Sequence, residues 1–184
     1  VSKANGIPLA KIASRIMSGE KLEKYKLKYK TNKKFAVKEA VFPFNKFPDS
    51  DVLLGPEMKS TGEVMGFDED FGMAVAKRQI AASNSLPIKG MAFLSVKDSH
   101  KQEIVGIAQR LVKLGFTLSA TKGTSDIIKQ NGMKCRKINK VSSGRPHIVD
   151  ILNSKKISLV INTGGGKSEH RLNDAIALRR ATLI

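Results

Sequence analysis

The feature that most constrains the fold is a regular alternation of short apolar runs and amphipathic helical patterns that begins at Gly90. The apolar runs are typical of strands, and the segments between them repeat apolar residues at helical spacing. Repeated strand–helix units indicate a parallel sheet with helices on both faces, joined by right-handed crossovers. Strands are expected at residues 90–96, 116–120, 133–138 and 157–161, and helices at residues 99–114, 125–131, after Pro146 and at 172–183.

Polar side chains follow several of these strands. Thr121, Lys140 and Asn162 each come after an expected strand. Ligands of parallel sheets bind beyond the carboxyl ends of the strands. We therefore expect these three residues to converge at one edge of the sheet.

The stretch Ser119-Ala120-Thr121-Lys122-Gly123-Thr124-Ser125 joins a strand to a helix. A hydroxyl- and glycine-rich turn before a helix suits a phosphate, because unpaired N–H groups and the helix dipole face the anion. Lys122 adds charge, and Gly123 lets the backbone approach closely. The alternative interpretation is that Thr124 or Ser125 only caps the helix.

The loop Gly164-Gly165-Gly166-Lys167-Ser168 resembles the end of a Walker A motif. That motif requires a further glycine at the position of Ile161, so an ordinary P-loop is excluded. An anion-holding glycine turn and a plain flexible loop both remain open.

Composition and charge favour anionic partners. The net charge is +17, although a lysine-rich solvated surface would give the same surplus. Aromatic residues are few and no nucleic-acid-binding motif is present, which argues against specific nucleic-acid recognition. The single cysteine suits a reducing cytosol, and no signal peptide or membrane-spanning run is evident.

Evident catalytic machinery is missing from these patterns. His147 lies near Lys140 and Arg145, but no Asp or Cys stands beside it in a catalytic arrangement. Asp126 and Asp150 are expected on helix faces. Anion binding without such machinery favours a sensor over an enzyme.

The first part of the chain has a different pattern. A helix is expected at residues 7–17, strands at 35–42 and 60–66, and a second helix from Asp68 to Ile80. Its carboxylates have no diagnostic metal-ligand spacing, so no metal site is expected. The small polar stretch at residues 82–87 separates two domains, predicted at 1–84 and 85–184.

Several long strings resemble the large chain of carbamoyl-phosphate synthase. They span residues 1–11, 38–48 and 54–66, and the shorter strings 144–148 and 161–163 continue the match. The resemblance implies the tail of the second ATP-grasp module (an incomplete α+β domain), followed by a methylglyoxal-synthase-like allosteric domain. That domain has a flavodoxin- or Rossmann-type five-stranded parallel sheet, of which this chain lacks the final strand and helix.

The resemblance also implies a role and partners. Members of the family are cytoplasmic, glutamine-hydrolysing, ATP-dependent ligases of pyrimidine and arginine biosynthesis, and they use Mg or Mn. The family's catalytic glutamate and asparagine precede Val1-Ser2-Lys3, so this chain is expected to be non-catalytic alone and to hold no cofactor. Its implied partners are nucleotide effectors, the rest of the large chain and a glutaminase small subunit. A second copy of the chain is a further candidate, whereas a membrane or specific nucleic acid is not.

In bacterial members the allosteric domain binds uridine monophosphate, and in some cases inosine monophosphate. Together with the phosphate turn, the family's binding positions predict an effector site at Lys101, Thr121, Lys122, Thr124, Lys140, Asn162 and Thr163. The sequence departs from the family at Gly164, where a threonine is frequent, and its glycine loop is two residues longer. A candidate ornithine site comprises Glu39, Phe42 and Asp174, with Phe42 in place of a common leucine.

Two other function classes stay open. A phosphate-eliminating lyase of the methylglyoxal synthase type would share the fold, but it needs an aspartate near the phosphate. A non-specific nucleic-acid-binding module would use the basic surplus directly.

Overall fold

The computed structural model describes residues 1–28, 33–44, 46–47, 54–84, 86–163 and 169–183. Two compact units make up the chain. Unit 1 comprises residues 1–42 and 60–86, and unit 2 comprises residues 43–59 and 87–184. Within the described residues, no helix is both long and apolar enough to cross a membrane. The division into domains at residue 84 stays a prediction.

Unit 1 combines short helices with a two-stranded sheet. Strands β1 (Phe35–Val41) and β2 (Gly62–Asp68) pair antiparallel, with Val37 opposite Gly66. Both strands and the helix that follows them were predicted. The unit's helical elements are α1 (Ser2–Asn5), α2 (Leu9–Met17), the 3₁₀ turn η1 (Leu22–Tyr25) and α3 (Phe71–Ala81).

Helix α3 packs closely on the two-stranded sheet because Gly66 has no side chain. A Cβ at this position would lie 1.8 Å from the carbonyl oxygen of Ala74, which is fully buried. An ion pair of 2.9 Å between Arg78 Nη1 and Glu39 Oε2 also joins α3 to β1. The contact between backbones is therefore possible only with glycine at position 66.

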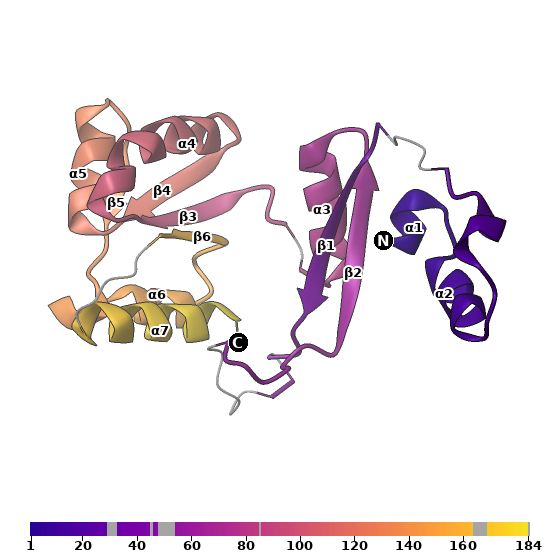
Figure 1. The fold of residues 1–184 in the computed structure, drawn as a ribbon. Coiled ribbons are helices and arrows are strands. Elements are labelled where there is room, and N and C mark those ends of the chain that lie inside the picture. The colour runs from indigo at the N-terminus through magenta and orange to yellow at the C-terminus, as the bar shows by residue number, and fades with distance from the viewer. Residues whose placement is uncertain (29–32, 45, 48–53, 85, 164–168, 184) are drawn as a thin grey trace. The chain divides into compact units, whose positions relative to one another are not determined.

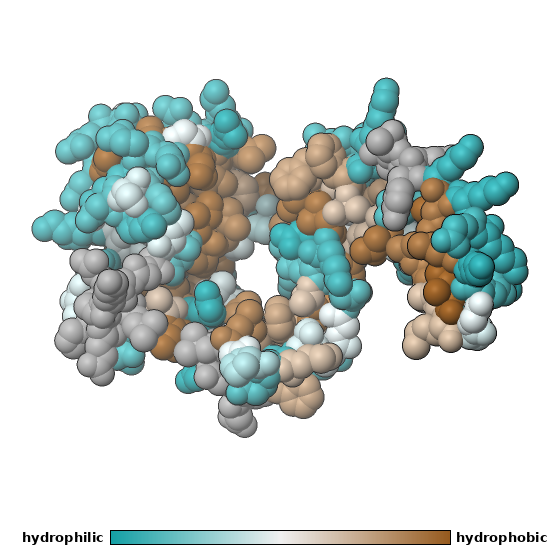
Figure 2. All heavy atoms as spheres, in the orientation of Figure 1, coloured by the Kyte–Doolittle hydropathy of each residue, from teal (hydrophilic) through white to brown (hydrophobic). Residues whose placement is uncertain are grey.

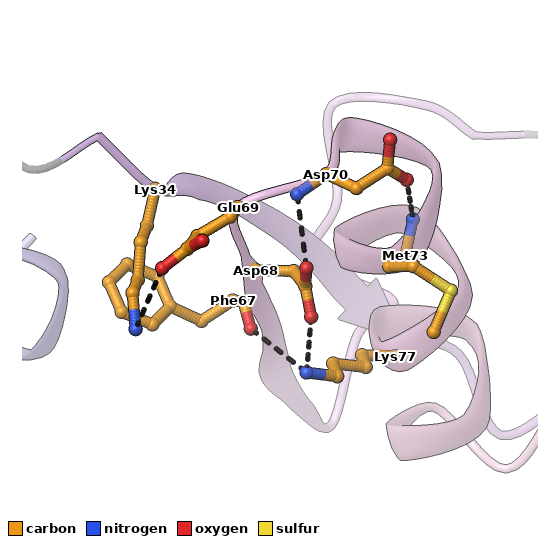
Figure 3. A network of polar contacts seen from close by, with 7 residues as sticks. All are labelled: Lys34, Phe67, Asp68, Glu69, Asp70, Met73 and Lys77. Carbon is orange, nitrogen blue, oxygen red and sulfur yellow. Dashed lines mark hydrogen bonds and ion pairs between the residues drawn. The ribbon is translucent and has the colours of Figure 1, made fainter.

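The start of α3 carries a network of acidic and basic side chains (Figure 3). Asp70 caps the helix, since its Oδ1 accepts a hydrogen bond of 2.8 Å from the N–H of Met73. Lys77 Nζ lies 2.5 Å from Asp68 Oδ2. The hydrogen bond from Lys77, helped by that from the Asp70 N–H, lowers the pKa of Asp68. Helix α3 begins at Phe71, three residues after the predicted start at Asp68.

Unit 2 is built on a parallel sheet. Its strands are β3 (Gly90–Ser95), β4 (Phe116–Ala120), β5 (Cys135–Lys137) and β6 (Leu159–Asn162), in the order β5-β4-β3-β6. The α/β class and the parallel pairing are confirmed. The described residues form the four strands expected from the sequence, one fewer than the five of the family's sheet, and the chain that follows β6 is helical at residues 169–183.

Helices cover both faces of this sheet, as predicted (Figure 1). The helices are α4 (Lys101–Lys113), α5 (Lys122–Gln130), α6 (Ile148–Asn153) and α7 (Glu169–Leu183), and the 3₁₀ turns are η2 (Asp98–His100) and η3 (Val141–Ser143). Alternation along β3 explains the two covered faces: Ala92 and Leu94 pack in the core under α4 and α5, whereas Phe93 packs on the opposite side with α6 and α7. In Figure 2, hydrophilic residues gather over the outer sides of α4 and α5.

Two helix starts differ from the prediction. Helix α4 begins at Lys101, two residues later than predicted, because residues 98–100 make a 3₁₀ turn. Helix α5 begins at Lys122 with Thr121 at its N-cap, three residues earlier than predicted. Thr124 and Ser125 therefore do not cap α5 but lie buried within its first turns.

Candidate functional site

The candidate site lies at the carboxyl edge of the sheet in unit 2. From β3 the chain adds β4 and β5 on one side and then places β6 on the other side of β3. Such a reversal of strand order is where open α/β sheets bind ligands. The loops there are tied to the sheet, because Thr121 N–H donates to Leu94 O (3.3 Å) and Thr163 N–H donates to Ser95 O (3.0 Å).

A cavity of about 340 Å³, here called the lysine cavity, opens at this edge. Four lysines from different elements reach it, so its electrostatic potential favours anions. Its lining residues are Val96, Asp98, Lys101, Thr121, Lys122, Gly123, Thr124, Lys137, Ile138, Asn139, Lys140 and Ser143.

The first turn of α5 forms one wall of the lysine cavity. Within the described parts of the chain, no acceptor contacts the backbone N–H groups of Lys122, Gly123 and Thr124. Such N–H groups carry the positive end of the helix dipole. This wall offers a phosphate both hydrogen-bond donors and favourable charge.

Two buried threonine hydroxyls complete that wall. Thr124 Oγ1 accepts a hydrogen bond from the Val96 N–H (3.3 Å) and lies 3.5 Å from Thr121 Oγ1. Thr121 and Thr124 are 5% and 1% exposed, so their positions are set by the core. Because the Thr124 oxygen acts as an acceptor, its own hydrogen is left for donation toward a ligand.

Lys101 lies against the same helix start. A Cβ on Gly123 would be only 2.9 Å from Lys101 Nζ, so glycine makes room for the ammonium group. Lys101 Nζ also pairs with Asp98 Oδ1 at 2.6 Å. A cation beside the positive end of a helix is electrostatically unfavourable unless an anion lies nearby.

A second cavity of about 140 Å³ adjoins the first. It is called the apolar cavity here after the six apolar side chains that share its lining with seven polar ones. The two share Val96, Asp98, Thr121 and Lys140, so they are neighbouring compartments of one site. The apolar side chains that line this second cavity are Phe93, Val96, Val141, Ile148, Ala175 and Leu178. Its polar lining comprises Ser95, Lys97, Asp98, Thr121, Lys140, Asn162 and Asp174.

The structure brings most of the predicted effector residues together. The lysine cavity holds five of them, Lys101, Thr121, Lys122, Thr124 and Lys140. Asn162 lines the apolar cavity with Thr121 and Lys140, so the three residues that follow strands do converge. Thr163 lines neither cavity; its Oγ1 accepts a hydrogen bond from the Lys97 N–H (3.3 Å). The glycine loop 164–168 lies outside the described residues.

The predicted ornithine residues belong to different units. Glu39 lies on β1 and Phe42 follows that strand, both in unit 1. Asp174 lies on α7 in unit 2, where its carboxylate accepts hydrogen bonds from the Ser142 N–H (3.0 Å) and Oγ (2.7 Å). Asp174 thereby also lines the apolar cavity.

Sequence reasoning missed several site residues. Lys137 lies at the end of β5 and Asp98 in the turn after β3. The rule that identified Lys140, a polar side chain after a strand, applies equally to Asp98 but not to Lys137, which is the last residue of its strand. No sequence signal distinguishes the apolar lining from ordinary core.

Two other titratable side chains of unit 2, His147 and Cys135, are engaged in helix capping and in core packing. His147 is the N-cap of α6; its N–H donates to Asp150 Oδ2 (2.9 Å), and its Nδ1 lies 3.1 Å from the same oxygen. Burial raises the pKa of the Cys135 thiol, so this group stays protonated in the core. Among the described side chains, no group of three or more His, Cys, Asp or Glu could hold a metal ion.

Comparison with known proteins bears directly on this unit. Residues 103–183 match the family described as the MGS-like domain. The matched residues run from the third residue of α4 through α7, and they include much of the lining of both cavities.

The whole chain is similar to carbamoyl phosphate synthase large chains, which confirms the predicted resemblance. It is 48% identical over 184 residues to the large chain of Pseudomonas putida, 48% over 185 residues to that of Archaeoglobus fulgidus, and 47% over 184 residues to that of Nostoc sp.. Each match covers all of this chain but only 16–17% of the relative. The chain therefore spans about one sixth of the length of these relatives.

Proposed function

We propose that unit 2 is an allosteric domain that binds a nucleoside monophosphate as an effector. One observation carries this proposal: an anion-attracting cavity and a cavity lined by both apolar and polar side chains adjoin across Thr121 and Lys140. A nucleotide has the same two-part chemistry, with a charged phosphate and a base that combines apolar faces with polar edges. Ligand sites combine apolar walls with a few convergent polar groups in this way.

The phosphate belongs in the lysine cavity. There Lys101, Lys122 and Lys140 supply charge, while Thr121 and Thr124 supply hydroxyl groups near the N–H groups of α5. The base and sugar belong in the apolar cavity, where Asn162 adds an amide. Thr163 acts from behind Asn162 by holding the Lys97 backbone. Uridine monophosphate, and in second place inosine monophosphate, are the proposed ligands.

In the wider context, we propose that the chain regulates a glutamine-hydrolysing carbamoyl-phosphate synthase in pyrimidine and arginine biosynthesis. That enzyme would use ATP with Mg or Mn, the rest of the large chain and a glutaminase small subunit in the cytoplasm. Effector binding would shift the equilibrium between two states, with a coupling free energy of about 1–3 kcal/mol. Ornithine binding by Glu39, Phe42 and Asp174 stays a prediction.

A thermal-shift and calorimetry panel tests the proposal. Uridine and inosine monophosphates should raise the melting temperature progressively as their concentration rises above the dissociation constant, whereas uridine should do so far less. Lys140→Ala should weaken uridine monophosphate binding, while Lys156→Ala, which removes an exposed lysine outside both cavities, should not. Equal effects of the two variants would refute a specific site and favour non-specific charge attraction.

Two further assays separate the alternative functions. A lyase needs an available aspartate near the phosphate, and the two aspartates that line the cavities, Asp98 and Asp174, contact Lys101 and Ser142. We therefore expect no turnover of dihydroxyacetone phosphate. A nucleic-acid-binding module would bind random duplex more strongly than mononucleotides, with a steep dependence on salt.

A further inference from the structure

Asp98 is the one carboxylate that lines both described cavities. Its Oδ1 lies 2.6 Å from Lys101 Nζ, and Lys101 in turn lies against Gly123 at the start of α5. An acidic side chain is thus held among the lysines that would attract a phosphate. The sequence patterns and the family resemblance assign it no role.

We propose that Asp98 competes with the ligand's phosphate for Lys101 and thereby limits the affinity of the site for anions. This inference rests on the proposed function. A phosphate oxygen in a charge-assisted hydrogen bond to Lys101 lies at about 2.8 Å from Nζ. It therefore comes within roughly 5 Å of the Asp98 carboxylate, where like charges repel.

The exposure of the pair decides how strong this competition is. The Asp98 side chain is 88% exposed and that of Lys101 is 28% exposed. An exposed carboxylate turns toward water easily, and exposed ion pairs contribute little free energy. Asp98 therefore weakens phosphate binding without preventing it, and it leaves Lys101 placed beside the helix N-terminus.

The test removes the charge at position 98 in the full chain and measures binding of inorganic phosphate and uridine monophosphate by calorimetry. Asp98→Asn should tighten both by about two- to fivefold, the range that an exposed ion pair supports. Uridine, which has no phosphate, should bind the variant and the unmodified chain equally. Glu103→Gln removes an acidic charge on α4 outside both cavities and should change neither affinity.

A double-mutant cycle identifies Lys101 as the shared partner. In a Lys101→Met background, Asp98→Asn should give a smaller gain than in the unmodified chain. Asp98→Ala serves as a second variant, and circular dichroism confirms that each variant folds.

Each outcome decides the matter. If Asp98→Asn leaves phosphate affinity unchanged, competition is excluded while the proposed function stands. If it weakens uridine monophosphate binding, Asp98 is a ligand contact instead, and the inference is wrong. If no version binds phosphate or nucleotide, the proposed function fails and this inference fails with it.

Discussion

Thr124 Oγ1 accepts a hydrogen bond of 3.3 Å from the backbone N–H of Val96. This bond joins the first turn of α5 to the segment that follows β3, two parts of the chain that meet only in the folded unit. Thr124 is 1% exposed, so packing holds its hydroxyl group in place. The same side chain thus contributes to stability and to the wall of the lysine cavity.

Thr124→Val should therefore destabilise unit 2. The substitution keeps the shape of the side chain but leaves the Val96 N–H without its acceptor, which costs about 1–3 kcal/mol. Urea unfolding followed by circular dichroism measures the loss. Thr124→Ser keeps the hydroxyl and should retain most of the stability. Equal loss in both variants would mean that the methyl group, not the hydrogen bond, matters.

Thr121→Ala should weaken nucleotide binding while leaving the fold intact. Thr121 is the N-cap of α5, but its side chain makes no capping hydrogen bond, so little helix stability depends on it. Its hydroxyl lines both cavities, and its loss should weaken uridine monophosphate binding by about three- to tenfold. Calorimetry checks the affinity, and an unchanged value would count against the site.

Gly123→Ala should separate binding from stability. A Cβ would lie 2.9 Å from Lys101 Nζ and must displace this flexible group from the helix start. Alanine is the better helix former by up to about 1 kcal/mol, so stability should not fall. Phosphate affinity should drop because the added methyl group keeps both the Lys101 ammonium group and the phosphate farther from the first turn of α5. Tighter phosphate binding by this variant would contradict the proposed role of Lys101.

Gly66→Ala should disrupt unit 1. The added Cβ would lie 1.8 Å from the Ala74 carbonyl oxygen and 2.7 Å from the backbone nitrogen of Arg78, so α3 must move away from β2. Overpacking of this kind costs about 1–3 kcal/mol or more. Gly62→Ala is the matched control, because a Cβ at this end of the same strand meets nothing within 4 Å. Similar denaturation midpoints for the two variants would overturn this account.

Lys77 should control the titration of Asp68. The hydrogen bond from Lys77 is the main cause of the lowered pKa of Asp68. Because the pKa is lowered on folding, the stabilisation is present above the pKa of unfolded Asp and is lost as the pH falls through the folded value. In Lys77→Met, NMR titration of the Asp68 carboxyl carbon should show a higher midpoint.

The control for this titration is Lys34→Met. Lys34 contacts Glu69 at 3.9 Å, in the same acidic stretch as Asp68. This variant removes an equal charge and should leave the Asp68 midpoint where it was. If the Asp68 midpoint shifted equally in both variants, the lowered pKa would result from the summed electrostatic effect of nearby lysines and not from the hydrogen bond to Lys77.

The strands of unit 2 were predictable because burial on both faces requires nearly continuous apolar runs. The start of α5 was not, since Gly123 has low helix propensity and suggested a turn. In the structure, Thr121 N–H donates to Leu94 O and Thr124 Oγ1 accepts a hydrogen bond from the Val96 N–H, so tertiary contacts place the helix start earlier. Non-local hydrogen bonds of this kind leave no local pattern in the sequence.

The sequence predicted the polar residues of the candidate site that follow strands, but not the ion pair or the apolar cavity. Thr121, Lys140 and Asn162 follow strands, and parallel topology alone brings them to one edge. The pairing of Asp98 with Lys101 depends on side-chain conformations within two short turns, which periodicity does not report. The apolar cavity depends on where α7 packs, since Ala175 and Leu178 come from a helix far along the chain.

The apolar cavity draws its walls from both ends of unit 2, from Phe93 to Leu178. A partly folded chain therefore lacks the complete site that a ligand requires. All of a ligand's binding free energy then acts on the native state, and its concentration sets the fraction of chains that are folded. Any metabolite that occupies these cavities would protect newly made protein from proteolysis, and its supply would influence the abundance of the protein.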